Sequence, residues 1–161
     1  MALEISKKKA GSAELEALLV EARALLERLS EHADRDVQVF EAYMRALRLP
    51  KASESEQTER RAALRAATKV ATEAPLMAAE DHLRALVLAA RASGSIESNV
   101  RSDLYAGADL LLGATKASLR SVDINLPNLD DETLHAEVSA RARALAQQTD
   151  ALHAEILSSA K

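Results

Sequence analysis

Residues 34–51 read DRDVQVFEAYMRALRLPK, and they end a stretch, residues 13–47, in which apolar side chains return every three or four positions. This spacing predicts one long amphipathic helix. The helix is expected to end before Pro50, because a proline disfavours helical backbone in the residue before it. Asp36 is the anomaly, since it places a carboxylate among the apolar positions of the helix.

One apolar stripe of this helix is expected to face the core, at about 100° per residue. Its members are Leu19, Ala22, Leu26, Leu29, Ala33, Val37, Phe40, Met44 and Leu47. Asp36 projects close to the centre of the stripe, and burial of an unpaired carboxylate costs several kcal/mol. Arg60 is a candidate partner, because it shares an inward face of the next helix, and Asp103 lies on a third apolar face. The three charges predict either a buried ion pair plus a helix cap, or a polar pocket between helices.

The remaining helices are predicted from capping and stop signals. A break at Gly11 and a cap at Ser12 are expected to start the first long helix. The second helix is expected to open at Ser53 with an S-x-x-E capping box, and Pro75 to kink or restart it. The further ranges are about 76–92, 100–120 and 132–157, the last capped by Asp130 or Asp131. This pattern predicts an all-α fold, an antiparallel bundle of four to five helices.

Composition narrows the class of protein. The 161 residues are 48% apolar but only 2% aromatic, which is typical of one helical domain over residues 1–161. The net charge of −4 is interspersed, so nucleic-acid binding is not expected. There is no cysteine, no secretory signal and no apolar run long enough for a membrane span, so we expect a cytoplasmic chain with no membrane partner.

Metal chemistry is not expected, because the four histidines lack the spacing of a ligand set. They are predicted to lie on solvated helix faces, at His32, His82, His135 and His153. A polar pocket would instead draw on residues near helix ends, namely Lys51, Asn99, Asn125 and Asn128. Tyr43 lies two turns beyond Asp36 on the same face, where it could bind Asp36 or a substrate, or simply pack in the core.

Several short motifs occur in a characteristic order. They are Asp36 with VFEAYMRALRLPK, then Glu56 and Arg60, ATEAPL at 71–76, NVRSD at 99–103, and SVDINLPNLDD at 121–131. Over nearly the whole chain, this order resembles the cyclodeaminase and methenyltetrahydrofolate cyclohydrolase family, which also forms the C-terminal domain of formiminotransferase-cyclodeaminase.

The resemblance implies an all-helical homodimer that acts on one-carbon tetrahydrofolates and needs no cofactor beyond that folate substrate. Members either close 5-formiminotetrahydrofolate to the 5,10-methenyl form with loss of ammonia, or hydrolyse the methenyl form to 10-formyltetrahydrofolate. On this reading we expect catalytic roles for Asp36, Asp103 and Lys51. Substrate-binding roles are expected for Tyr43, Arg48, Arg60, Asn99 and Asn125.

Two features differ from the family pattern. Members usually begin with a PGGGS turn and a long apolar helix, whereas MALEISKKK resembles only the tail of that helix, so either a shortened form or a misplaced start is expected. Ser121 also replaces the usual asparagine before the INL motif. The competing hypothesis is therefore a catalytically weak or inactive helical-bundle dimer that acts as a folate-binding or protein-interaction module.

Overall fold

The computed structural model describes residues 1–10 and 13–158, and every regular element in these residues is a helix. The α-helices are α1 (Ala2–Ala10), α2 (Ala13–Leu47), α3 (Glu54–Ala92), α4 (Arg101–Asn125) and α5 (Glu132–Ser158). Two short 3-10 turns, η1 (Ser93–Ser95) and η2 (Ser98–Val100), lie between α3 and α4, and a third, η3 (Leu126–Asn128), lies between α4 and α5. The predicted all-α fold is confirmed, while the predicted break at Gly11 and cap at Ser12 lie outside the described residues.

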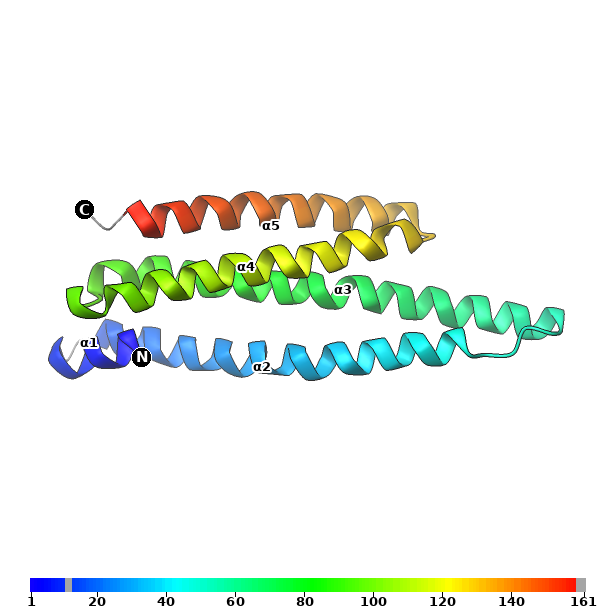
Figure 1. The fold of residues 1–161 in the computed structure, drawn as a ribbon, viewed down its shortest axis with the longest axis horizontal. Helices are drawn as coiled ribbons and strands as arrows, with labels where there is room; N and C mark the ends of the chain where they lie inside the picture. Colours follow the sequence, from blue (N-terminus) through cyan, green and yellow to red (C-terminus); the bar gives the residue numbers. More distant parts are fainter. Residues whose placement is uncertain (11–12, 159–161) are drawn as a thin grey trace.

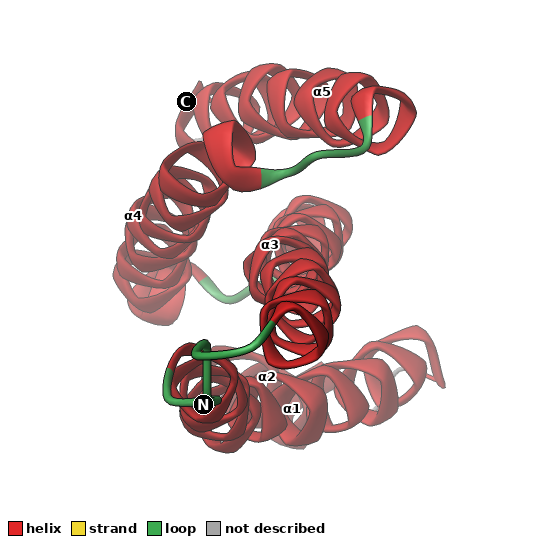
Figure 2. Cartoon of the chain, turned by 90° about the vertical axis from the view of Figure 1, so that its right-hand side faces the viewer, coloured by secondary structure: helices red, strands yellow, loops and turns green. Residues whose placement is uncertain are grey.

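The long helices run alternately in opposite directions, with α3 at the centre (Figure 1). Figure 2 shows α3 between α2 on one side and the α4/α5 pair on the other. In the described residues, α2 and α4 each pack along α3 but scarcely touch each other. Since both are antiparallel to α3, α2 and α4 run parallel to each other on either side of a seam whose floor is α3.

The face of α2 that packs on α3 is not the one that the sequence predicts. Leu18, Leu25 and Ala46 are buried there, on a seven-residue spacing that also includes His32 and the half-buried Val39. A seven-residue repeat keeps one line of side chains against a neighbouring helix over many turns. Helix α3 therefore takes this line of side chains rather than the predicted stripe.

Much of the predicted stripe is exposed instead. Leu26, Val37 and Phe40 are 64%, 58% and 63% exposed. Helix α2 thus carries two apolar lines along its length, and one chain covers only the first. A contiguous apolar line on a surface is typical of a contact with another molecule.

Helix α3 continues without interruption through Pro75, where a kink or restart was predicted. A proline has no N–H to bond the carbonyl four residues earlier, which leaves the Ala71 oxygen without its helical partner. The side-chain amide of Asn125, at the end of α4, donates to this Ala71 oxygen at 2.8 Å. The amide replaces the missing backbone bond and ties α4 to α3, so the helix need not break.

Helix termini agree closely with the sequence signals. Ser53 and Glu56 form the predicted capping box at the start of α3, and Asp131 Oδ1 accepts the Leu134 N–H at 3.0 Å to cap α5. Helix α4 is longer than predicted, because residues 121–125 are helical rather than irregular. The LPN turn, η3, therefore follows directly after Asn125, the residue that contacts Ala71.

Candidate functional site

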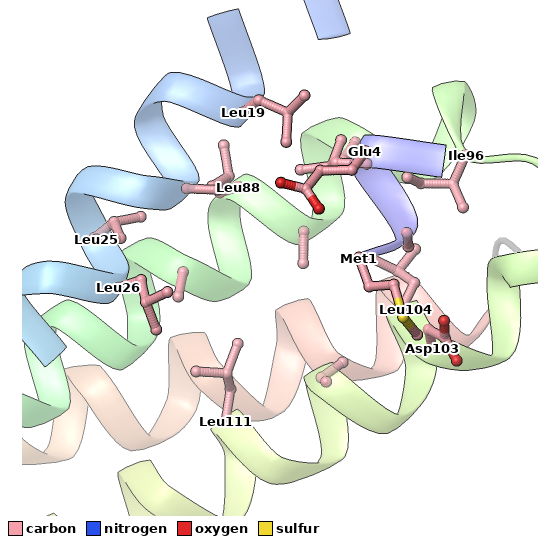
Figure 3. A pocket seen from close by; sticks show the side chains of 18 of the residues that line it. Met1, Glu4, Leu19, Leu25, Leu26, Leu88, Ile96, Asp103, Leu104 and Leu111 are labelled. Atoms are coloured by element: carbon pink, nitrogen blue, oxygen red, sulfur yellow. The ribbon is translucent and has the colours of Figure 1, made fainter. Parts of the chain in front are cut away.

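A wide hollow of about 580 Å³ opens between α2 and α4 over the floor of α3. Its walls are mainly apolar side chains, and α1 lies across its end (Figure 3). The polar groups that line it are Glu4, Arg23 and Asp103. Glu4 and Arg23 form an ion pair of 3.0 Å, and Figure 3 shows Asp103 beside Met1 and Leu104. This space is suited to a flat, largely apolar molecule.

A narrow hollow of about 300 Å³ lies further along the same helices. A larger share of its lining residues is polar: His32, Arg35, Asp36, His82, Ser118 and Ser121 lie beside Ala74, Pro75, Ala78 and Ala117. A carboxylate, a guanidinium, two imidazoles and two hydroxyls therefore come together from three helices. Groups of these kinds can move protons and bind a polar substrate edge.

The two hollows follow one another along one seam. On α2 the lining passes from residues 19–29 to residues 32–36, and on α4 from residues 103–111 to residues 117–121. On α3, which runs the other way, it passes from residues 85–92 to residues 74–82. We call the pair of hollows the α2/α4 groove, apolar at the α1 end and polar at its middle.

Burial shapes the chemistry of His82. Desolvation, helped by the nearby charge of His32, lowers the pKa of His82 against the attraction of Asp81. Its Nδ1 atom is buried and has no hydrogen-bond partner among the described residues. His82 is therefore neutral at physiological pH, with one ring nitrogen left for a ligand or a water molecule.

Two of the predicted catalytic residues lie in the groove, but far from each other. Asp36 is exposed at the rim of the narrow hollow, whereas Asp103 lines the wide hollow. Asp103 precedes Ser118 by fifteen residues on α4, which is about 22 Å of helix. Asn99 is exposed in the turn before α4, at the Asp103 end, and Tyr43 is half-buried two turns beyond Asp36.

The predicted cationic residues lie at the end of the bundle where α2 joins α3, opposite the end that holds α1 and Asp103. Arg48 and Lys51 are exposed in the turn between α2 and α3. Arg60 donates from Nε and Nη2 to the Leu47 carbonyl, at 3.3 and 3.2 Å, and so caps the end of α2. Leu47 is eleven residues from Asp36, about 17 Å of helix. The expected ion pair between Asp36 and Arg60, and the convergence of both with Asp103 in one chain, are therefore wrong.

Asn125 has a structural task that the sequence did not reveal, since its amide nitrogen binds the Ala71 carbonyl. The sequence also missed Asp81, His32 and His82. His32 and His82 line the narrow hollow, and His153 is largely buried against Asp109, so solvated faces were the wrong prediction for three of the four histidines. The seven-residue line through Leu18, Leu25 and Val39 was the signal that could have placed His32 inward.

Two further findings concern the described residues alone. No three histidine, aspartate or glutamate side chains in residues 1–10 and 13–158 come together as a metal site. In the same residues, no helix combines the length and apolar character that a membrane crossing requires.

Comparison with known proteins agrees with this architecture. The chain is 30% identical to formimidoyltransferase-cyclodeaminase of Sus scrofa over 136 residues, which cover 81% of this chain and 24% of the pig protein. It is 28% identical to methenyltetrahydrofolate cyclohydrolase of Methylorubrum extorquens, over 99% of this chain and 77% of that protein. The chain thus spans about a quarter of the vertebrate relative and about three quarters of the bacterial one.

The fold is also similar to that of a solved structure. The crystal structure of formiminotetrahydrofolate cyclodeaminase from Thermotoga maritima superimposes with a TM-score of 0.78. The match covers 99% of this chain and 77% of that one, at 24% sequence identity. The family model described as formiminotransferase-cyclodeaminase matches residues 1–144. The chain therefore belongs to the formiminotransferase-cyclodeaminase family.

Proposed function

We propose that this chain is a folate one-carbon enzyme that acts at the bridging carbon between N5 and N10 of tetrahydrofolate. The reaction is hydrolysis of the 5,10-methenyl form, as by a cyclohydrolase, or closure of the 5-formimino form with loss of ammonia, as by a cyclodeaminase lyase. The observation that carries the proposal is the α2/α4 groove, where an apolar hollow of about 580 Å³ meets a polar hollow with a carboxylate and two imidazoles.

The division of the groove suits a tetrahydrofolate. The apolar end offers room for flat rings, and the polar middle offers the proton-transfer groups that both reactions need. Asp36 lines the rim of the polar hollow, and we assign to it the stabilisation of the delocalised cation of the methenyl form, because an opposite charge within a few ångströms favours a cation. Asp103 lies about 22 Å of helix from Ser118, too far to bind the pterin of a folate whose bridging carbon is beside Asp36, so its role toward substrate stays a prediction.

The proposal includes a homodimer built on the exposed line of α2. Leu26 belongs to that line and also lines the wide hollow, so a second copy packed there would form a further wall of the groove. Phe40 and Val37 extend the line toward the end of α2. The second copy would cover the side of the α2/α4 groove that is open to solvent in a single chain.

Several expectations stay predictions. They are roles toward substrate for Tyr43, Arg48, Lys51, Arg60, Asn99 and Asn125, a cytoplasmic location, and independence of any cofactor. For Arg60 and Asn125, a structural role is already visible, because each binds a backbone carbonyl.

The test follows the absorbance of the methenyl chromophore with purified protein. Loss of absorbance above the buffer rate supports the cyclohydrolase reaction, and gain of absorbance from the formimino substrate supports the cyclodeaminase reaction. Asp36→Asn is expected to lower kcat at least about 100-fold with little change in melting temperature, since Asp36 is exposed.

The matched control is Asp34→Asn. Asp34 is an exposed carboxylate on the same helix and is absent from the lining of either hollow. Equal activity of Asp36→Asn and Asp34→Asn would reject the role of Asp36. A wild-type chain that converts neither substrate would instead favour a folate-binding or protein-interaction module. Isothermal titration with 5-formyltetrahydrofolate would then distinguish these two, because only a folate-binding module would bind it.

A further inference from the structure

A buried carboxylate lies behind the narrow hollow. Asp81 on α3 is 6% exposed. Its Oδ1 accepts from Arg28 Nη2 at 2.7 Å and from Arg84 Nη1 at 2.5 Å, and its Oδ2 lies 2.9 Å from His32 Nε2. Two arginines and one histidine therefore converge on one carboxylate, although a single cation would suffice to neutralise it.

The surroundings keep Asp81 ionised. Burial opposes its charge, but hydrogen bonds from His32 and Arg84, with the charges of Arg28 and Arg84, outweigh burial and lower the pKa of Asp81. A carboxylate in this state accepts the Nε2–H of His32, which fixes the neutral ring as the tautomer with a lone pair on Nδ1.

His32 occupies a position that packing alone would give to an apolar residue. It continues the line of Leu18 and Leu25, and its side chain is only 17% exposed. It also lines the narrow hollow, one turn before Asp36. One ring nitrogen is thus held by the protein interior, while the ring itself forms part of the wall of the site.

We propose that His32 is the proton-transfer residue of the groove and that Asp81 is its positioning residue. This inference rests on the proposed function and assigns the groups that carry its proton steps. A neutral imidazole whose other nitrogen is held by a carboxylate is an effective general base, because the carboxylate fixes the ring and stabilises the imidazolium that forms.

In the cyclohydrolase reaction, His32 Nδ1 takes a proton from the water whose oxygen bonds to the bridging carbon. The same proton then passes to N5 as the bond from carbon to N5 breaks, leaving the formyl group on N10. The second proton of the water leaves the carbinol oxygen for solvent, so the methenyl cation and water give 10-formyltetrahydrofolate and one proton.

In the cyclodeaminase reaction, N10 bonds to the formimino carbon and its proton passes to His32. His32 returns that proton to the departing nitrogen, and one further proton from solvent completes the balance. The 5-formimino form and one proton thus give the methenyl cation and ammonia. One imidazole can therefore serve either reaction.

The charged and titratable groups around His32 come from two helices. From α2 they are Arg28, Arg35 and Asp36, and from α3 they are Asp81, Arg84 and the neutral His82. Helix α4 contributes hydroxyls to the hollow, from Ser118 and Ser121, and no charged side chain to its lining. Asp81 is the carboxylate in direct contact with His32.

The experiment measures kcat for wild type, His32→Gln, Asp81→Asn and His153→Gln in the reaction that the wild type catalyses. His32→Gln is expected to lower kcat about 10²- to 10⁴-fold. Asp81→Asn is expected to lower kcat less and to leave KM nearly unchanged, because His32 keeps its ring but loses the carboxylate that fixes it. His153 is the matched control, since its Nε2 pairs with Asp109 at 2.6 Å outside the groove.

A second variant separates chemistry from folding. The His32→Ala variant is expected to regain activity when imidazole is added, above the rate that imidazole gives without protein. Repair of a packing defect alone would not produce this recovery. The inference would be overturned if the wild type is active and His32→Gln is equally active, or if imidazole does not restore His32→Ala. Either result would leave the proposed function standing. A silent wild type would overturn both.

Discussion

Replacing Asn125 tests how the bundle keeps α3 continuous through Pro75. Asn125→Ala leaves the Ala71 carbonyl without a hydrogen bond in a partly buried place. A lost bond of this kind costs about 1–2 kcal/mol, which for a chain of this length corresponds to a melting temperature lower by about 2–8 °C. Pro75→Ala restores an N–H at position 75, which can bond the Ala71 oxygen within the helix.

In the Pro75→Ala background, Asn125→Ala should therefore lower the free energy of unfolding by less than about 0.5 kcal/mol. The double-mutant cycle should then give a coupling of about 1 kcal/mol between the two positions. Urea unfolding followed by circular dichroism, at one fixed protein concentration, measures all four corners of the cycle. Asn128→Ala is the control, because its amide lies 3.5 Å from the Ile124 oxygen in an exposed turn. Equal costs of Asn125→Ala in both backgrounds would refute the reasoning.

Two further predictions concern the dimer and the buried histidine. Phe40→Glu should weaken self-association by at least about 2 kcal/mol, roughly 30-fold in Kd. Ile124→Glu, at another exposed apolar position on α4, should not. Light scattering over a dilution series measures both, and a wild-type monomer at micromolar concentration would contradict the dimer. The free energy of unfolding should fall as pH drops from 7 toward 5. The reason is that His82 is protonated near its ordinary pKa in the unfolded chain, while burial lowers its pKa in the folded chain. A His82→Gln variant with the same pH dependence as wild type would show that His82 is not the cause.

The sequence predicted the helices well because their boundaries depend on local signals. The capping box at Ser53 and the cap at Asp131 act within one turn, and the structure contains both. Pro75 was misjudged for a physical reason. The group that compensates for its missing N–H, Asn125, comes from a helix fifty residues later, and local sequence rules do not include such a partner.

The site was only partly predictable. Asp36 was recognised as unusual, and it does lie at the polar hollow. Its predicted partner was wrong, because two apolar lines run along α2 and periodicity alone did not show which one α3 covers. The choice of line also determines whether His32 faces the core. Asp81 carried no sequence signal, since its importance comes only from the two arginines and the histidine that surround it.

The most direct test of the central claim is turnover by the wild-type chain itself. Purified protein, incubated with methenyltetrahydrofolate and separately with 5-formiminotetrahydrofolate, is followed by absorbance of the methenyl group. We predict a change in one of the two reactions that is proportional to protein concentration and saturates with substrate. A chain that is fully helical by circular dichroism, yet leaves both substrates at the buffer rate, would contradict the assignment of the α2/α4 groove as a folate active site.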